Sequence, residues 1–175
     1  PGLVHNLGFE KFFAREDIAD VNSYLGYLAA DEFELTQPVC DWLEQSDKPF
    51  MLTILGSASH DPYEIPDKYK GSDYSDDDEP EVKYRRLIEY TDSFLAGLYE
   101  KLDEVTNMDK TVFCVIGDHG EAFGQHDRYG HARIPYDEAL KVFWFIKSPK
   151  MIKKPVKIDA PVSSIDVTPP LLNLL

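Results

Sequence analysis

Apolar and charged residues recur at helical spacing over one long stretch of the chain. Between residues 81 and 105, one side of the expected helix carries uncharged, mostly apolar side chains at Tyr84, Leu87, Ile88, Thr91, Phe94, Leu95, Leu98 and Leu102. A second helix is predicted over residues 31–45, with Asp31 as its cap. Pro38 lies inside this second run and allows a helix start as late as Gln37. The pattern therefore predicts two helices, one of them long.

Three short apolar runs, residues 50–55, 111–116 and 142–146, predict strands. A helical or turn segment is predicted over residues 135–140, and an apolar helix after Pro169 and Pro170. Strand, long helix, strand, short connection and strand is the order of an α/β fold with a largely parallel sheet flanked by helices. The 175 residues fit one such domain. Sheets of this kind bind ligands beyond the carboxyl ends of their strands.

Composition narrows the partners that the chain can have. It holds 32 acidic and 18 basic residues, with a formal net charge of -14, which argues against nucleic acid or an anionic membrane surface as the main partner. An anionic substrate stays compatible, because a bound metal ion can be the largest charge in a site. Cys40 and Cys114 lie far apart and in no metal-ligand spacing, so free thiols are expected. The sequence predicts no signal peptide and no membrane span, and it leaves the oligomeric state open.

Candidate metal ligands follow the second predicted strand. Asp118 and His119 lie on a turn where Gly117 and Gly120 permit unusual backbone angles. A carboxylate oxygen and an imidazole nitrogen are suitable ligands for a divalent ion, zinc especially. The same residues can instead begin a helix, with Asp118 as its N-cap and Glu121 completing a capping box. Taken alone, the residues support the two interpretations equally.

Two further histidines, His60 and His131, are expected near the same edge of the sheet. His60 follows the run 50–55, and His131 closes the stretch that begins with the strand of Asp118. Each alone fits an ordinary turn or loop residue, but imidazoles beside a metal can hold a tetrahedral oxyanion and protonate a leaving oxygen. No nucleophile accompanies them, because Ser57 and Ser59 lack the G-x-S-x-G elbow. The acidic stretch 71–80 lacks calcium-loop spacing and is interpreted as a solvated loop.

These motifs resemble the sulfatase family of the alkaline phosphatase superfamily over most of the chain. The family's metal-binding aspartate, loop and next strand are similar to VIGDHGEAFGQHDRYGH followed by IPYDEALKVFWFI. Its strand ending in a histidine resembles KPFMLTILGSASHDPYEIP, and its long helix resembles YRRLIEYTDSFLAGLYEKLDE. Its segment of strand, aspartate, prolines and leucine-rich helix resembles VSSIDVTPPLLNLL. The resemblance implies that residues 1–175 are the C-terminal part of an alkaline-phosphatase-like catalytic domain.

The resemblance also implies a role for each candidate residue. Asp118 stands at the metal-ligand aspartate, and His119 at a second ligand that is Asn or His in the family. His60 resembles the histidine that contacts the ester group and helps the leaving oxygen depart. His131 stands where the family places a Lys or His that holds the transferred anion, whereas His126 is interpreted as a loop residue. The family's nucleophile, a formylglycine or, in related transferases, a threonine, is not recognisable in this chain, nor are its other acidic ligands.

The function implied is metal-dependent hydrolysis of sulfate esters through a covalent intermediate, with phosphate or phosphonate esters as alternatives. A transferase of phosphoglycerol or phosphoethanolamine is the second candidate, because LGFEKFFARED resembles that branch nearly as much. A non-catalytic binding module with the same fold is the third. The implied cofactor is a divalent ion, Ca²⁺ or Zn²⁺, with Mn²⁺ and Mg²⁺ as further candidates. The implied partner is a sulfated or phosphorylated small molecule, glycan or lipid, outside the cytoplasm or at a membrane. Without the upstream nucleophile, the 175 residues alone are expected to be inactive.

Overall fold

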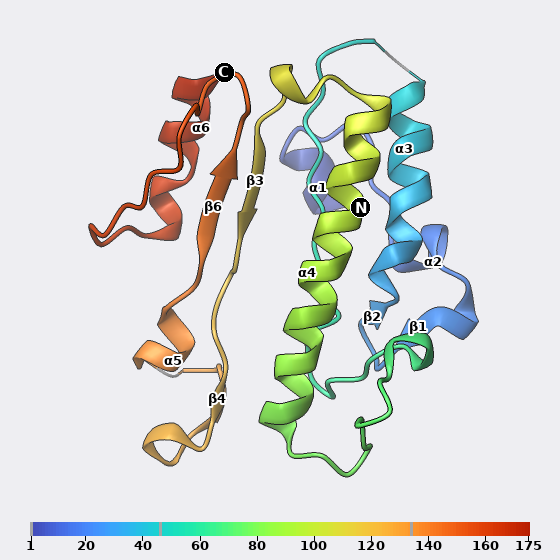
Figure 1. The fold of residues 1–175 in the computed structure, drawn as a ribbon, viewed down its shortest axis with the longest axis vertical. Coiled ribbons are helices and arrows are strands. Elements are labelled where there is room, and N and C mark those ends of the chain that lie inside the picture. Colours follow the sequence, from blue (N-terminus) through green and yellow to red (C-terminus); the bar gives the residue numbers. More distant parts are fainter. Residues whose placement is uncertain (1, 46, 134) are drawn as a thin grey trace. The chain divides into compact units, whose positions relative to one another are not determined.

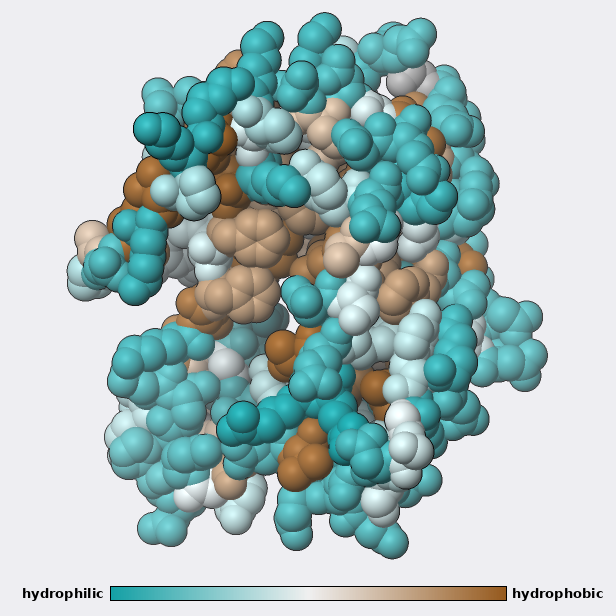
Figure 2. Space-filling view, viewed as in Figure 1, coloured by the Kyte–Doolittle hydropathy of each residue, from teal (hydrophilic) through white to brown (hydrophobic). Residues whose placement is uncertain are grey.

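The structure is a computed structural model that describes residues 2–45, 47–133 and 135–175. The chain divides into two compact units, a first unit Pro1–Thr106 and a second unit Asn107–Leu175. Helices make up most of the first unit, and the second unit contains short strand pairs (Figure 1). The face drawn in Figure 2 is mostly hydrophilic, in keeping with the net charge of -14. That residues 1–175 form a single domain stays a prediction.

The first unit contains the helices α1 (Gly2–Asn6), α2 (Arg15–Ile18), α3 (Thr36–Glu44) and α4 (Pro80–Val105), the 3-10 helices η1 (Val21–Ser23), η2 (Glu32–Leu35) and η3 (Asp67–Tyr69), and the antiparallel strands β1 (Tyr24–Leu25) and β2 (Ala29–Ala30). The second unit contains the 3-10 helices η4 (Met108–Lys110), η5 (Gln125–Asp127) and η6 (Ser164–Asp166), the strands β3 (Phe113–Ile116), β4 (Ala122–Phe123), β5 (Tyr129–Gly130) and β6 (Trp144–Lys147), and the helices α5 (Asp137–Leu140) and α6 (Thr168–Leu174). Within these described residues, no helix is long and apolar enough to cross a membrane.

Helix α4 confirms the long helix that the sequence predicts. It begins at Pro80, where the missing proline N–H is not needed, and it runs to Val105. Its buried side chains recur at helical spacing and are Leu87, Tyr90, Phe94, Leu98 and Leu102. Ile88, which the sequence placed on the same face, is 42% exposed. Helix α3 packs beside α4 (Figure 1) and buries Val39, Cys40 and Leu43.

The helix predicted over residues 31–45 is split in two. Asp31 caps η2, because its Oδ1 accepts a hydrogen bond of 3.1 Å from the Phe33 amide. Helix α3 follows directly and accommodates Pro38 in its first turn, where a backbone N–H has no partner inside the helix. The cap was therefore predicted correctly, and the proline explains why a regular helix starts only after η2.

Residues 50–55 form no strand, so this part of the prediction is wrong. Met51 is 76% exposed and Leu55 is 83% exposed, whereas a strand buried on both faces would bury such side chains. None of the strands in the described residues pairs with this segment. Without a paired neighbour on either edge, its backbone follows an irregular path to His60.

The strands of the second unit pair in the opposite sense to the one predicted. β3 and β6 are antiparallel, with Phe113 opposite Lys147 and Ile116 opposite Trp144. β4 and β5 form a second antiparallel pair. A parallel pair would need a long crossover, usually a helix, but the only α-helix between β3 and β6 in the described part is the four-residue α5. The largely parallel sheet expected from the sequence is therefore not formed by the described residues.

Candidate metal and anion site

His60 lies at the end of a turn in the first unit. Its amide donates a hydrogen bond of 3.1 Å to the Ser57 carbonyl, and its Nδ1 lies 2.9 Å from the Asp61 carbonyl oxygen. A carbonyl oxygen can only accept, so Nδ1 carries a proton and Nε2 is the nitrogen that can gain or lose one. The Tyr27 hydroxyl lies 3.3 Å from the same Nδ1, and the two rings meet edge to face at 5.5 Å. The ring orientation is therefore set by contacts from two segments of the chain.

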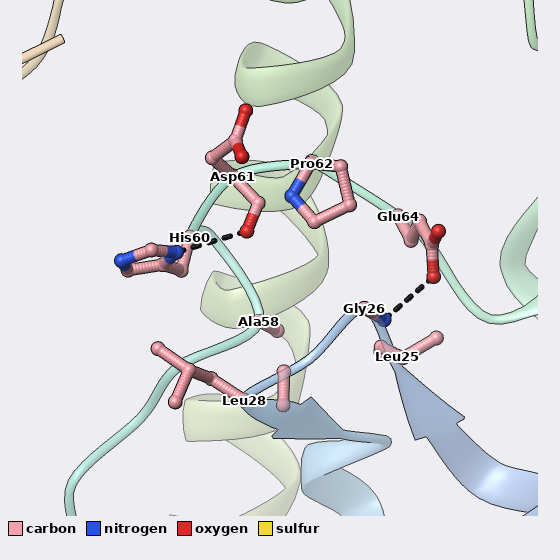
Figure 3. Close-up of a pocket in the computed structure, with 9 residues that line it drawn as sticks. Leu25, Gly26, Leu28, Ala58, His60, Asp61, Pro62 and Glu64 are labelled. Atoms are coloured by element: carbon pink, nitrogen blue, oxygen red, sulfur yellow. Dashed lines mark hydrogen bonds between the residues drawn. The ribbon is translucent and has the colours of Figure 1, made fainter.

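The surroundings of His60 form a shallow depression rather than an enclosed cavity. Its lining residues are Leu25, Gly26, Leu28, Ala29, Ala58, His60, Asp61, Pro62 and Glu64. Figure 3 shows the His60 ring on the opposite side of this depression from the hydrogen bond between the Gly26 amide and the Glu64 carboxylate, which measures 2.6 Å. The imidazole thus lies at an accessible rim.

Asp118 and His119 follow β3 in the second unit, as predicted. The His119 amide donates a hydrogen bond of 2.9 Å to Asp118 Oδ1, and His119 Nε2 lies 3.5 Å from Asp118 Oδ2. His119 Nδ1 lies 2.9 Å from the Gly120 carbonyl oxygen and therefore carries a proton. The side chains of Asp118 and His119 are 79% and 40% exposed. A carboxylate oxygen and an imidazole nitrogen thus lie side by side at an accessible position.

The glycines around these residues serve close packing, not unusual backbone angles. Neither Gly117 nor Gly120 has a positive φ, which corrects the expectation from the sequence. A β-carbon on Gly117 would lie 3.2 Å from the β-carbon of Val142, and one on Gly120 would overlap the Glu138 carbonyl oxygen. The Gly120 amide donates a hydrogen bond of 2.8 Å to the Ala139 carbonyl. The backbone that carries His119 is therefore held directly against α5.

The capped-helix interpretation of Asp118 is wrong. No helix starts at this position, and the next element along the chain is β4. Glu121 lies instead beside His131, with its two carboxylate oxygens 3.3 and 3.4 Å from His131 Nδ1. Its side chain is only 8% exposed. Sequence reasoning missed this role of Glu121, although a carboxylate in the same stretch as two histidines was a signal for it.

His119 and His131 stack on one another. Their ring centroids are 3.8 Å apart, with an angle of 25° between the ring planes. The antiparallel pairing of β4 with β5 produces this contact, because His119 precedes one strand and His131 follows the other. The structure therefore brings three of the four predicted site residues, Asp118, His119 and His131, into one cluster. His60 belongs to the first unit, where its ring lies beside Tyr27 and the Asp61 carbonyl.

His126 belongs to a separate set of contacts. Its Nδ1 lies 2.7 Å from Glu138 Oε1, and its ring stacks on Tyr136 at 4.1 Å. The hydrogen bond from His126 lowers the pKa of the Glu138 carboxyl. His126 lies in η5 and has a left-handed φ of 53°, so it is part of the turn between β4 and β5. These contacts link the turn to α5.

The donor chemistry of the cluster fits part of a metal site. Asp118 and His119 offer one oxygen and one nitrogen ligand, the types that Zn²⁺ accepts. Structural and catalytic zinc sites use three or four protein ligands, and the described residues contain no group of three or more His, Cys, Asp or Glu that could hold a metal. Asp118 and His119 would therefore have to share the ion with ligands from elsewhere in the protein.

Comparison with known structures shows a fold similar to that of a protein in the alkaline phosphatase superfamily. A crystal structure of a protein in that superfamily from Vibrio parahaemolyticus superposes with a TM-score of 0.70 at 24% sequence identity. The match covers 95% of this chain and 38% of that chain, so this chain spans well under half of the other protein. No curated protein matches the sequence significantly. The model of the sulfatase family matches residues 2–175, so the chain belongs to the sulfatase family.

Proposed function

We propose that the protein containing this chain is a metal-dependent hydrolase of sulfate esters, with phosphate or phosphonate esters as alternatives. The observation that carries this proposal is the cluster of Asp118, His119 and the stacked His131. Membership of the sulfatase family supports an ester as the substrate. Asp118 and His119 would hold a divalent ion, Zn²⁺ or Ca²⁺ with Mn²⁺ or Mg²⁺ as alternatives. When bound, the ion would stabilise negative charge on the sulfuryl or phosphoryl oxygens.

The mechanism assigned to the residues of this chain is proton transfer and anion binding. A nucleophilic oxygen outside this chain attacks sulfur or phosphorus, and the bond from that atom to the leaving oxygen breaks. His60 passes its Nε2 proton to the leaving oxygen and keeps its Nδ1 proton on the Asp61 carbonyl, 2.9 Å away. His131 holds the transferred anion, and Glu121 orients its ring through Nδ1 at 3.3 Å. Water then releases the anion from the nucleophile.

Two alternatives make different predictions. A transferase of phosphoglycerol or phosphoethanolamine would carry a threonine nucleophile in the preceding sequence, whereas a Cys-x-Pro-x-Arg motif there would select the sulfatase. A non-catalytic module would bind a divalent ion weakly or not at all. For the hydrolase and for the transferase, we propose a location outside the cytoplasm or at a membrane. The reason is that both imply lipid or glycan substrates.

The test compares variants of the full-length gene product on 4-nitrophenyl sulfate and 4-nitrophenyl phosphate. Chelation should abolish turnover, and Asp118→Ala or His119→Ala should lower kcat about a hundredfold. Asp109→Ala is the matched control, because Asp109 is an exposed carboxylate of the same unit in η4. Titration with Zn²⁺, Mn²⁺ or Ca²⁺ should raise the melting temperature of the wild type but not of Asp118→Ala. Metal-independent turnover, or equal turnover in Asp118→Ala and the control, would refute the proposal.

A further inference from the structure

Glu32 is a buried carboxylate that makes hydrogen bonds to a distant loop. Its residue is only 4% exposed, although the chain is rich in acidic residues that lie in solvent. Its Oε1 accepts hydrogen bonds of 2.8 Å from the Ser57 amide and 3.0 Å from the Ala58 amide. Its Oε2 is buried and has no hydrogen-bond partner among the described residues. Burial of a carboxylate costs free energy that its hydrogen bonds must offset, so a buried carboxylate with one oxygen lacking a partner calls for an explanation.

The loop lies directly against this carboxylate. A β-carbon on Gly56 would lie 2.9 Å from Glu32 Oε1, so a larger residue there would require the loop or the Glu32 side chain to shift. Ala58, whose amide donates to the same oxygen, is only 2% exposed. Three consecutive residues, Gly56 to Ala58, are therefore shaped around the Glu32 side chain.

A second set of hydrogen bonds holds Glu32 itself. Its amide donates a hydrogen bond of 2.6 Å to the Tyr90 hydroxyl, which in turn donates one of 2.6 Å to Asp31 Oδ1. The other carboxylate oxygen of Asp31 lies 2.6 Å from Lys68 Nζ. Tyr90 belongs to the buried face of α4, so the network fixes η2 to the longest helix of the unit. Glu32 thus projects toward the loop from a position that packing and hydrogen bonds restrain.

The loop that Glu32 holds ends at His60. The carbonyl of Ser57 accepts the hydrogen bond of 3.1 Å from the His60 amide, and the carbonyl of His60 accepts one of 3.0 Å from the Tyr63 amide. The residue whose amide Glu32 binds therefore also binds the His60 backbone. A shift of Ser57 would move the start of the turn and, with it, the imidazole.

We propose that Glu32 is a positioning residue, which holds the turn Ser57–His60 so that the His60 imidazole meets the leaving oxygen. The role of His60 at the leaving oxygen rests on the proposed function. The anchoring of the turn by Glu32 is independent of activity. Positioning is a demanding role, because misplacing a catalytic group by about 1 Å can reduce the rate about a hundredfold.

The first test measures amide hydrogen exchange in the full-length gene product. Glu32→Ala should lower the protection of the Ser57 and Ala58 amides about tenfold, because each loses its acceptor. Glu34→Ala is the matched control, since it removes the same charge from the same η2, whereas the hydrogen bonds to the Ser57 and Ala58 amides come from Glu32. Glu32→Gln keeps a carbonyl oxygen for both amides and should retain most of the protection. Unchanged protection in Glu32→Ala overturns the proposal, whether or not the protein turns over an ester.

The second test separates positioning from general loss of structure. A general acid matters most when the leaving group is poor, so His60→Ala should slow a phenyl ester at least tenfold more than the 4-nitrophenyl ester. Glu32→Ala should likewise slow the phenyl ester about fivefold to tenfold more than the 4-nitrophenyl ester. Partial unfolding would instead lower both rates by the same factor. An equal loss on both esters overturns the positioning role. If the wild type hydrolyses neither ester, the proposed function fails, and hydrogen exchange alone decides whether Glu32 anchors the turn.

Discussion

The Tyr90→Phe substitution tests the hydrogen-bond network beneath η2. The change deletes one hydroxyl and keeps the ring, which packs edge to face against Phe33 at 5.6 Å and against Tyr69 at 5.0 Å. Tyr90 is only 4% exposed, so the lost hydroxyl lies in a buried environment. The substitution therefore isolates the polar contribution of a single buried atom.

The magnitude follows from the two hydrogen bonds of that hydroxyl. Its bond of 2.6 Å to Asp31 Oδ1 has a charged acceptor and contributes about 1.5–3 kcal/mol. Its loss also leaves the buried Glu32 amide without an acceptor, which costs about 1–3 kcal/mol. Asp31 keeps its contacts with the Phe33 amide and Lys68, so its carboxylate still has hydrogen-bond and charge partners. The two contributions together give an expected loss of about 2.5–6 kcal/mol in the free energy of unfolding.

The assay is urea unfolding followed by far-ultraviolet circular dichroism, which detects the helices α3 and α4 of the first unit. The midpoint should fall with little change in the slope, because the folded state stays equally compact. Tyr129→Phe is the control, since Tyr129 is 79% exposed and should change stability by less than about 0.5 kcal/mol. A loss in Tyr90→Phe no larger than in this control would refute the account of the network.

Two further predictions concern protonation and close packing. Burial raises the pKa of Glu32 above its ordinary value of 4.5, so the folded chain binds this proton more tightly than the unfolded chain. The contribution of protonated Glu32 to the free energy of unfolding should be complete below the ordinary pKa and should decline as the pH rises through the raised pKa of the folded state. Urea unfolding should show that the free energy of unfolding falls less between acidic and neutral pH in Glu32→Gln than in the wild type. The same dependence on pH in both proteins would contradict this. Gly120→Ala should lose about 1–3 kcal/mol in thermal unfolding, because its β-carbon overlaps the Glu138 carbonyl. Gly97→Ala in α4, where the β-carbon meets Phe33 at an ordinary 3.8 Å, should instead gain up to about 1 kcal/mol.

Periodicity predicted the elements whose stability depends on local pattern. Helix α4 matches its prediction within one residue at its start, because five buried positions repeat at helical spacing along one face. β3 and β6 also lie within one or two residues of the predicted runs. Asp31 was identified as a cap because a short acidic side chain before an apolar run has few other local uses.

Pairing between strands could not be predicted in the same way. An apolar run such as residues 50–55 is compatible with a buried strand, but a strand exists only if another strand lies beside it. The direction of β6 relative to β3 depends on how residues between them fold, and those residues form a hairpin and the short α5. The pattern of apolar residues within a run predicts neither whether a partner strand lies beside it nor in which direction that partner runs.

The candidate site was predictable by residue type but not by contact. Asp118, His119 and His131 form one cluster, as placement along the chain suggested. The pairing of Glu121 with His131 and the burial of Glu32 depend on the tertiary structure, and both carboxylates lie in sequence contexts that equally suit exposed residues. Glu121 stands at the spacing of a capping box, and its pairing with His131 depends on contacts that the sequence does not show.

The hairpin of β4 and β5 separates the part of the loop that must stay constant from the part that can vary. Pairing of Ala122 with Gly130 closes the backbone just beyond the two stacked imidazoles. The tip of the hairpin lies between the paired residues Phe123 and Tyr129, outside the pairing that brings His119 and His131 together. A change of tip length therefore leaves in place the strand pairing that holds the two imidazoles together.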